Sequence, residues 1–92
     1  MDIQEQIAIN LRRIRVARGI SQDELALTSG VERAYVGHLE RGAKNPTVKT
    51  LEKISIGLQC RVRDFFEDVE GMNYDRSTLP PGRKGFRERE QS

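Results

Sequence analysis

Hydrophobic residues recur every three or four positions at the start of the chain, and this spacing places them on one face of an α-helix. They are Ile3, Ile7, Leu11 and Ile14. Gly19 follows, and glycine commonly ends a helix because it adopts left-handed backbone angles at little steric cost. The pattern predicts a first helix that runs from residue 3 to about residue 18.

The second predicted helix is marked by signals at both of its ends. Ser21 and Glu24 have the spacing of a capping box, in which each side chain binds the backbone N–H of the other residue. The helix that begins there ends near Gly30, a suitable residue for a left-handed turn. Leu25 and Ala26 are expected on its inner face.

The third predicted helix is short and polar. Val36 and Leu39 are three positions apart, so both reach its inner face. This helix spans residues 32–41 and closes there, because Gly42 follows directly. A turn anchored by Val31 separates it from the helix before it.

A proline separates this polar helix from the rest of the domain. The residue before Pro46 is pushed away from helical angles, and Thr47 supplies an N-cap for a fourth helix. One face of that helix consists of Val48, Leu51, Ile54, Ser55 and Leu58. A short fifth helix that closes the core is indicated by Cys60, Val62, Phe65 and Phe66.

The chain divides into a helical domain and a tail. The sequence has no alternating strand pattern and no internal repeat, so we predict an all-α fold of five helices over residues 1–70. Residues 71–92 contain prolines and glycines and few apolar residues, which predicts a flexible basic C-terminal tail. The apolar residues there are either ordinary linker residues or points that dock on a protein partner or on the domain: Met72, Tyr74, Leu79 and Phe86.

Length and composition narrow the class of protein. The 92 residues suffice for one modest core, and no apolar run approaches the roughly 20 residues that cross a bilayer. Cys60 is the sole cysteine and the N-terminus has no signal-peptide pattern, so we expect a cytoplasmic protein without an intrachain disulfide. His38 is the sole histidine, and the sequence shows no grouping of catalytic, cofactor-binding or metal-binding residues. We therefore expect neither an enzyme nor a metalloprotein.

The charge is unevenly distributed along the chain. The net charge is only +2, but residues 33–63 carry seven Lys or Arg side chains against two Glu side chains. A polyanion such as double-stranded DNA would approach this half of the domain first. A solvated charged surface gives the same count, so the charge alone leaves both interpretations open.

Residues 21–41 have the plan of a helix-turn-helix unit, in which the second helix enters a DNA major groove. The sequence resembles the phage-repressor and Cro class of helix-turn-helix proteins, also called the xenobiotic-response-element family, over residues 7–67. The resemblance rests on Ile20-Ser21-Gln22-Asp23-Glu24-Leu25-Ala26, Gly30-Val31, Tyr35-Val36, Leu39-Glu40-Arg41-Gly42 and Asn45-Pro46-Thr47. Within this class, the segment Glu32-Arg33-Ala34-Tyr35-Val36 looks most like the controller proteins of restriction and modification systems. The implied fold is the five-helix, lambda-repressor-like domain of bacterial and phage regulators.

The resemblance assigns DNA contacts to individual residues. Gln22, at the start of the second helix, matches a position that binds a backbone phosphate in this family. The face of the recognition helix that reaches base edges carries Arg33, Ala34, Tyr35, Gly37 and His38. Arg33 is the strongest candidate for reading sequence, because a guanidinium binds both acceptors of guanine.

The other positions on that face leave alternatives open. Ala34 either touches a thymine methyl group or only permits close approach, and Gly37 has no side chain with which to read a base. Tyr35 either contacts DNA or packs at the edge of the helix. His38 either contacts a phosphate or a base, or is an exposed side chain without a role.

Two further sets of residues are assigned by the same resemblance. Arg41, Lys44 and Asn45 form the loop after the recognition helix, where the family grips the phosphate backbone. Arg15 and Glu40 match a partly buried salt bridge between the first helix and the recognition helix. Because a guanidinium and a carboxylate pair in a fixed geometry, this salt bridge is expected to orient the recognition helix.

The expected function is sequence-specific regulation of transcription, by a repressor or autoregulator at a pseudo-palindromic DNA operator. A single short helix reads too few bases, so we expect a homodimer formed through the fifth helix. Phe65 and Phe66 point in different directions on a helix, so either one fills the core while the other meets the partner, or both rings lie in the same core. The alternative is an antitoxin-like or protein-binding module, in which the tail or the fifth helix dominates partner binding.

Overall fold

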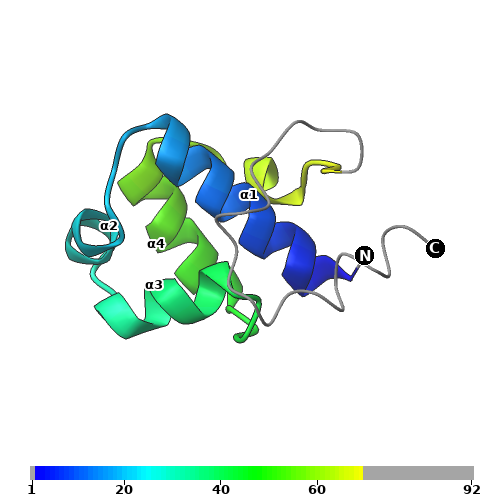
Figure 1. Cartoon of the computed structure of the whole chain (residues 1–92), viewed down its shortest axis with the longest axis horizontal. Helices are drawn as coiled ribbons and strands as arrows, with labels where there is room; N and C mark the ends of the chain where they lie inside the picture. The colour runs from blue at the N-terminus through cyan, green and yellow to red at the C-terminus, as the bar shows by residue number, and fades with distance from the viewer. Residues whose placement is uncertain (1, 70–92) are drawn as a thin grey trace.

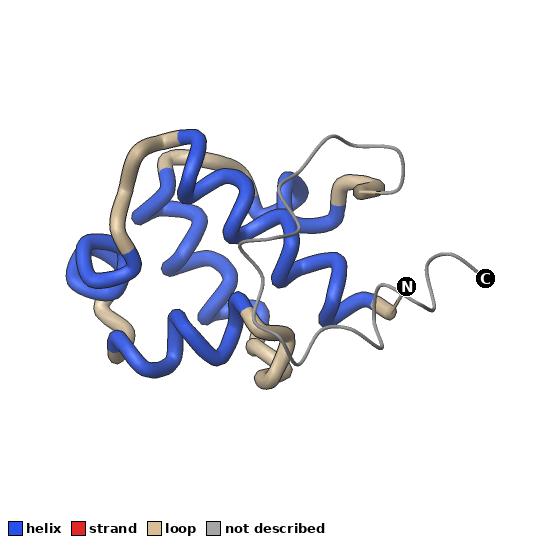
Figure 2. Tube along the Cα trace, viewed as in Figure 1, coloured by secondary structure: helices blue, strands red, loops and turns tan. Residues whose placement is uncertain are grey.

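The computed structural model describes residues 2–69, which form four α-helices and one short 3-10 helix (Figure 1). Their bounds are α1 Ile3–Ala17, α2 Gln22–Ser29, α3 Arg33–Glu40, α4 Val48–Leu58 and η1 Val62–Phe66. Figure 2 shows helices and connecting loops and no strand in this part of the chain, which confirms the all-α class. The predicted tail, with Met72, Tyr74, Leu79 and Phe86, lies outside the described residues.

The fifth element differs from the prediction. It is a 3-10 helix of five residues. The backbone is extended at Arg61 before it and at Glu67 after it, and these two residues mark its ends. A segment this short is of the kind in which 3-10 geometry is commonly found. The sequence therefore predicted its place in the chain correctly and its helix type incorrectly.

The ends of α2 and α4 follow from local chemistry. Ser21 Oγ accepts a hydrogen bond from the Glu24 amide and Glu24 Oε1 accepts one from the Ser21 amide, both at 3.0 Å. Gly30 then ends α2 in the left-handed region, at φ 73°. Thr47 caps α4 by accepting from the Thr50 amide at 3.1 Å. Both caps and the glycine stop are confirmed.

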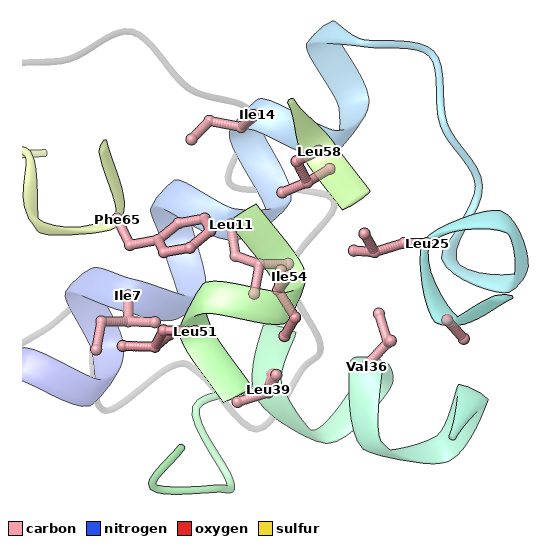
Figure 3. Close-up of a cluster of buried hydrophobic side chains, with 11 residues drawn as sticks. Ile7, Leu11, Ile14, Leu25, Val36, Leu39, Leu51, Ile54, Leu58 and Phe65 are labelled. Carbon is pink, nitrogen blue, oxygen red and sulfur yellow. The ribbon is translucent and has the colours of Figure 1, made fainter. Parts of the chain in front are cut away.

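One hydrophobic core joins all five elements. Figure 3 shows its side chains converging from α1, α2, α3, α4 and η1, each at most 7% exposed: Ile7, Leu11, Ile14, Leu25, Val36, Leu39, Leu51, Ile54, Leu58 and Phe65. Ile3 and Val48, which the periodicity placed in this core, are 54% and 78% exposed. Each is the first residue of its helix, and periodicity within one helix does not determine whether another element covers its first turn.

A glycine lets α2 and α4 approach closely. A Cβ atom at Gly57 would overlap Ser29 Oγ and lie 3.2 Å from Leu25 Cδ1, so a side chain there would force the two helices apart. The close contact brings α2 firmly onto the core. Because α3 follows α2 after a short turn, this packing also positions α3.

Side-chain amides hold η1 against α1. Asn10 Nδ2 donates to the carbonyl oxygens of Phe65 and Glu67 at 2.9 Å, and Gln6 Nε2 donates to that of Phe66 at 2.7 Å. Asn10 is fully buried, so these hydrogen bonds satisfy an amide that has no access to water. They fix the short C-terminal helix on the side of α1 from which Phe65 enters the core.

Candidate nucleic-acid interface

The helix α3 lies along one edge of the molecule, with α2 beside it (Figure 1). Val36 and Leu39 point into the core, so the opposite side of α3 faces outward. On that outer side Arg33 and Ala34 are exposed, and Tyr35 and His38 are half-buried. Tyr35 packs against the hydrophobic core, so the packed alternative describes its position in the structure.

A buried carboxylate fixes the orientation of α3. Glu40 is 3% exposed and pairs with Arg15, whose Nε lies 2.5 Å from Glu40 Oε2. Glu40 Oε1 also accepts hydrogen bonds from Arg12 Nη1 at 3.3 Å and Gln22 Nε2 at 2.9 Å. We call these four residues the Glu40 cluster. The expected pair between α1 and α3 is present, and the structure adds two partners that the sequence did not suggest.

Gln22, to which a phosphate contact was assigned, is a member of the Glu40 cluster. Gln22 stands at the first position of α2 and is half-buried, with one amide N–H directed at Glu40. Its location at the helix N-terminus agrees with the expectation, because backbone N–H groups there attract anions. Its side chain also links α2 to α3.

The predicted sequence-reading residue has an intramolecular partner. Arg33 Nε lies 2.8 Å from Asp23 Oδ1, and the two side chains are 52% and 82% exposed. The partner is on α2, where it follows Gln22 in the chain. No sequence rule pairs these two residues, because their contact depends on the angle between α2 and α3.

Gly37 lies on the outer side of α3 but is buried rather than exposed. A Cβ atom there would lie 3.3 Å from Arg33 Nη1 and 3.4 Å from Arg41 Nη1. The two arginine side chains, four positions before and after, therefore cover the backbone of Gly37. A glycine in a helix costs about 1 kcal/mol relative to alanine, and here it makes room for these two guanidinium groups.

His38 and Arg41 form a pair on the outer side of α3. Arg41 Nη2 lies 2.6 Å from His38 Nδ1. A guanidinium only donates hydrogen bonds, so Nδ1 accepts and the imidazole carries its proton on Nε2. The ring therefore has a donor available at Nε2 for a contact outside this pair.

The loop between α3 and α4 presents polar side chains. Arg41, Lys44 and Asn45 are all exposed. Gln4 Nε2, in α1, donates to the Lys44 carbonyl oxygen at 2.9 Å and ties the loop to the body of the domain. The side chains of Lys44 and Asn45 are thus presented from an anchored backbone.

A groove of about 360 Å³ runs between the start of α2 and α3. It is lined by Arg12, Arg15, Ser21, Gln22, Asp23 and Arg33. Arginine side chains and the first turn of a helix together suit an anion such as a DNA phosphate. Asp23 brings a negative charge into the same groove.

The two adjacent phenylalanines have different environments. Phe65 is fully buried in the core, whereas Phe66 is 41% exposed. Phe65 is therefore unavailable to a partner molecule, and of the two phenylalanines only Phe66 is accessible for a contact between copies.

Cys60 lies in the connection between α4 and η1, beside a hollow of about 380 Å³ that Arg18 and Asp64 also line. Burial raises the pKa of the Cys60 thiol, the Asp64 carboxylate raises it further and Arg18 lowers it. Among residues 2–69 no three His, Cys, Asp or Glu side chains gather as a metal site would require. In the same part of the chain, no helix has the length and apolar character of a membrane span.

Comparison with known proteins identifies the family. Residues 11–65 match the helix-turn-helix family HTH_3, more than half of the chain. This protein belongs to that family. The control protein C.SmaI of Serratia marcescens is 45% identical over 62 residues, which cover 67% of this chain and 74% of that protein.

Solved structures of HTH_3-like controller proteins share the fold. C.AhdI of Aeromonas hydrophila is 36% identical with a TM-score of 0.67, over 68% of this chain and 96% of that one. C.Esp1396I, solved as a tetramer on its natural 35 base-pair operator, is 32% identical with a TM-score of 0.67, over 72% and 87%. The expected resemblance to restriction-modification controller proteins is confirmed.

Membership of the HTH_3 family indicates what the protein does. The protein is a DNA-binding transcriptional regulator of the xenobiotic-response-element type. Its helix-turn-helix unit consists of α2 and α3. Sequence reasoning missed Arg12 and Asp23, for which neither spacing nor capping gave a signal.

Proposed function

We propose that the protein represses transcription by binding a pseudo-palindromic DNA operator as a homodimer, with α3 of each protomer in successive major grooves. The observation that carries this proposal is the division of α3 into two sides. Its inner side is fixed by the core and the buried Glu40 cluster, and its outer side presents Arg33, His38 and Arg41. A firmly held helix with an exposed polar side is suited to reading base edges.

Base reading is assigned to the first turn of α3. Arg33 is exposed there and has the fork of donors that matches O6 and N7 of guanine. Ala34 is its exposed neighbour, and its methyl group suits contact with the methyl group of thymine. His38, one turn later, offers Nε2–H to a base or a phosphate.

Phosphate contacts are assigned to the groove and to the loop on either side of α3. At the groove, Gln22 and the first backbone N–H groups of α2 bind one phosphate. Beyond the other end of α3, Lys44 and Asn45 bind another from the anchored loop. Contacts on both sides set the depth and register of α3 in the major groove.

A dimer is needed for sequence specificity. Eight residues of α-helix are about 12 Å long, which matches only three to four base pairs. Two copies related by a two-fold axis place two recognition helices about 34 Å apart and read two half-sites. Phe66 supplies an exposed aromatic side chain on η1 for the contact between copies.

Repression follows from occupancy. A dimer bound over a promoter blocks polymerase without making a further contact, so the described surfaces are sufficient for it. The similarity to controller proteins, one of them solved on its natural operator, supports this assignment. Because such an operator can lie upstream of the regulator's own gene, autoregulation is included in the proposal.

Footprinting on DNA upstream of the protein's own gene tests the proposed function. We expect two protected half-sites with approximate two-fold symmetry, spaced by one turn of DNA. Reporter expression from the same DNA should fall when the protein is supplied. If no site is protected at concentrations below those that coat non-specific DNA, the proposal is contradicted and the protein-binding alternative is favoured.

A further inference from the structure

We propose that Asp23 is a positioning residue for base reading, which holds the guanidinium of Arg33 so that its two terminal amino groups face the DNA. This inference rests on the proposed function, because it assumes that Arg33 reads a base. It adds a specificity-determining residue on α2, outside the recognition helix. Asp23 itself makes no base contact in this scheme.

Asp23 holds Arg33 by one particular atom, Nε. Asp23 Oδ1 accepts from Nε at 2.8 Å, so Nη1 and Nη2 are not used by this ion pair. A guanine presents two acceptors, O6 and N7, which two donors of one guanidinium bind together. An arginine anchored through Nε therefore keeps a complete edge of its fork for the base.

The guanidinium of Arg33 also rests against the backbone of α3. Arg33 Nη1 lies close to the backbone of Gly37, 3.3 Å from where a Cβ atom would stand. The group is thus bounded by Asp23 on one side and by the α3 backbone on another. A free arginine side chain has many rotamers, and one that is ordered before binding loses less conformational entropy on the DNA.

Asp23 also changes the electrostatics beside Arg33. Asp23 is a carboxylate in a groove lined by Arg12 and Arg15, the groove that suits a phosphate. A phosphate that approached Arg33 directly would also approach Asp23, and the two negative charges would repel. The carboxylate therefore opposes the non-specific complex, in which Arg33 binds the backbone, more than the complex in which Arg33 binds guanine.

The exposure of the Arg33–Asp23 pair determines whether it affects folding stability or DNA recognition. At 52% and 82% exposure the ion pair contributes little to folding, because water screens it. Inside a major groove DNA displaces much of that water, and the hydrogen bond to Nε becomes stronger. The pair is therefore expected to change base preference and to leave stability almost unchanged.

The test starts with a random-sequence duplex library, from which the purified full chain enriches its preferred duplex. Dissociation constants are then measured for duplexes in which each base pair is replaced in turn. For Asp23→Ala, the preference for guanine at the Arg33 position should fall by about fivefold or more, because part of a bidentate contact is lost. Affinity for random DNA should rise, and Asp23→Glu should restore part of the preference.

Glu32→Gln is the matched control. It removes one negative charge beside the start of α3, where Glu32 makes no capping hydrogen bond through its side chain. This variant should raise affinity for all duplexes evenly and keep the guanine preference. An unchanged preference in Asp23→Ala, or an equal loss in Glu32→Gln, would overturn the positioning role.

Arg33→Ala separates this inference from the proposed function. If Arg33→Ala abolishes the guanine preference and Asp23→Ala does not, Arg33 reads the base and the inference about Asp23 is wrong. If Arg33→Ala keeps the preference, the role of Asp23 is overturned while operator binding stands. If the wild-type chain enriches no duplex, both proposals are overturned. In the Arg33→Ala background, Asp23→Ala should cause no further loss.

Discussion

Among the arginine–carboxylate pairs that connect α3 to the helices before it, two differ most in their exposure to water. In the pair of Arg15 and Glu40 the side chains are 9% and 3% exposed. In the pair of Arg33 and Asp23 they are 52% and 82% exposed. Both pairs join a guanidinium to a carboxylate at hydrogen-bond distance, so they differ in burial and not in chemistry. We assign their different roles to this difference in burial.

The difference follows from the medium around each pair. Charges interact more strongly where water is excluded, and a buried charge that loses its partner is left without solvation. An exposed pair exchanges its partner for water with little change in free energy. The buried pair therefore maintains the fold and the orientation of α3, while the exposed pair is available for recognition.

The largest expected effect is on stability when the buried pair is broken. Glu40→Ala leaves Arg15 buried without its carboxylate, so we expect a loss of about 3–5 kcal/mol in the free energy of unfolding. Urea denaturation followed by circular dichroism measures this change. A loss below about 1 kcal/mol would place this pair in the same class as exposed ones and remove the contrast.

The adjacent phenylalanines extend the contrast between buried and exposed partners to assembly. Phe66→Ser should turn the proposed dimer into a monomer in sedimentation experiments, and it should lower stability less than the same change at the fully buried Phe65, because Phe66 is 41% exposed. Leu27→Ser is the control, since Leu27 is 84% exposed on α2 and has no assigned role in dimerisation. A wild-type chain that is a monomer at micromolar concentration, with or without operator DNA, would refute the dimer.

A substitution at Lys44 tests whether an exposed cation next to α3 binds a DNA phosphate. If Lys44 binds one phosphate in each half-site, Lys44→Ala reduces the slope of log affinity against log salt by about two units per dimer. Base preferences should hardly change. Lys53→Ala, on α4, is the control because no DNA contact is assigned to that helix. An unaltered slope in Lys44→Ala would show that Lys44 is only a solvated surface charge.

The smallest expected effect is on stability when the exposed pair is broken. Asp23→Ala breaks the exposed pair and should change the free energy of unfolding by less than about 1 kcal/mol. The same denaturation series as for Glu40→Ala measures it. A loss as large as that of Glu40→Ala would mean that exposure does not distinguish the two pairs.

Structural features that depend on a few neighbouring residues were predicted correctly from the sequence. The capping box of Ser21 and Glu24 and the N-cap Thr47 depend on backbone N–H groups within the same turn. The pair of Arg15 and Glu40 was expected from a resemblance, because no local rule joins residues so far apart. Helix periodicity also identified most of the core.

Features that depend on how helices pack were missed or wrong. Ile3 and Val48 lie on the expected helices but are exposed, because coverage depends on neighbouring elements. Gly37 is covered by two arginine side chains, and their conformations depend on contacts that the sequence does not reveal. The pair of Arg33 and Asp23 depends on the angle between α2 and α3. These are properties of the assembled helix-turn-helix unit.

The most direct test of the account is the binding of wild-type protein and Arg33→Ala to an operator series changed one base pair at a time. We predict that Arg33→Ala costs about 1–3 kcal/mol per half-site at a guanine-containing operator and loses the preference at that base pair. Affinity for random DNA should fall much less. An even loss across all duplexes, with every base preference intact, would contradict base reading by Arg33, and specificity would then come from Tyr35, His38 or DNA shape.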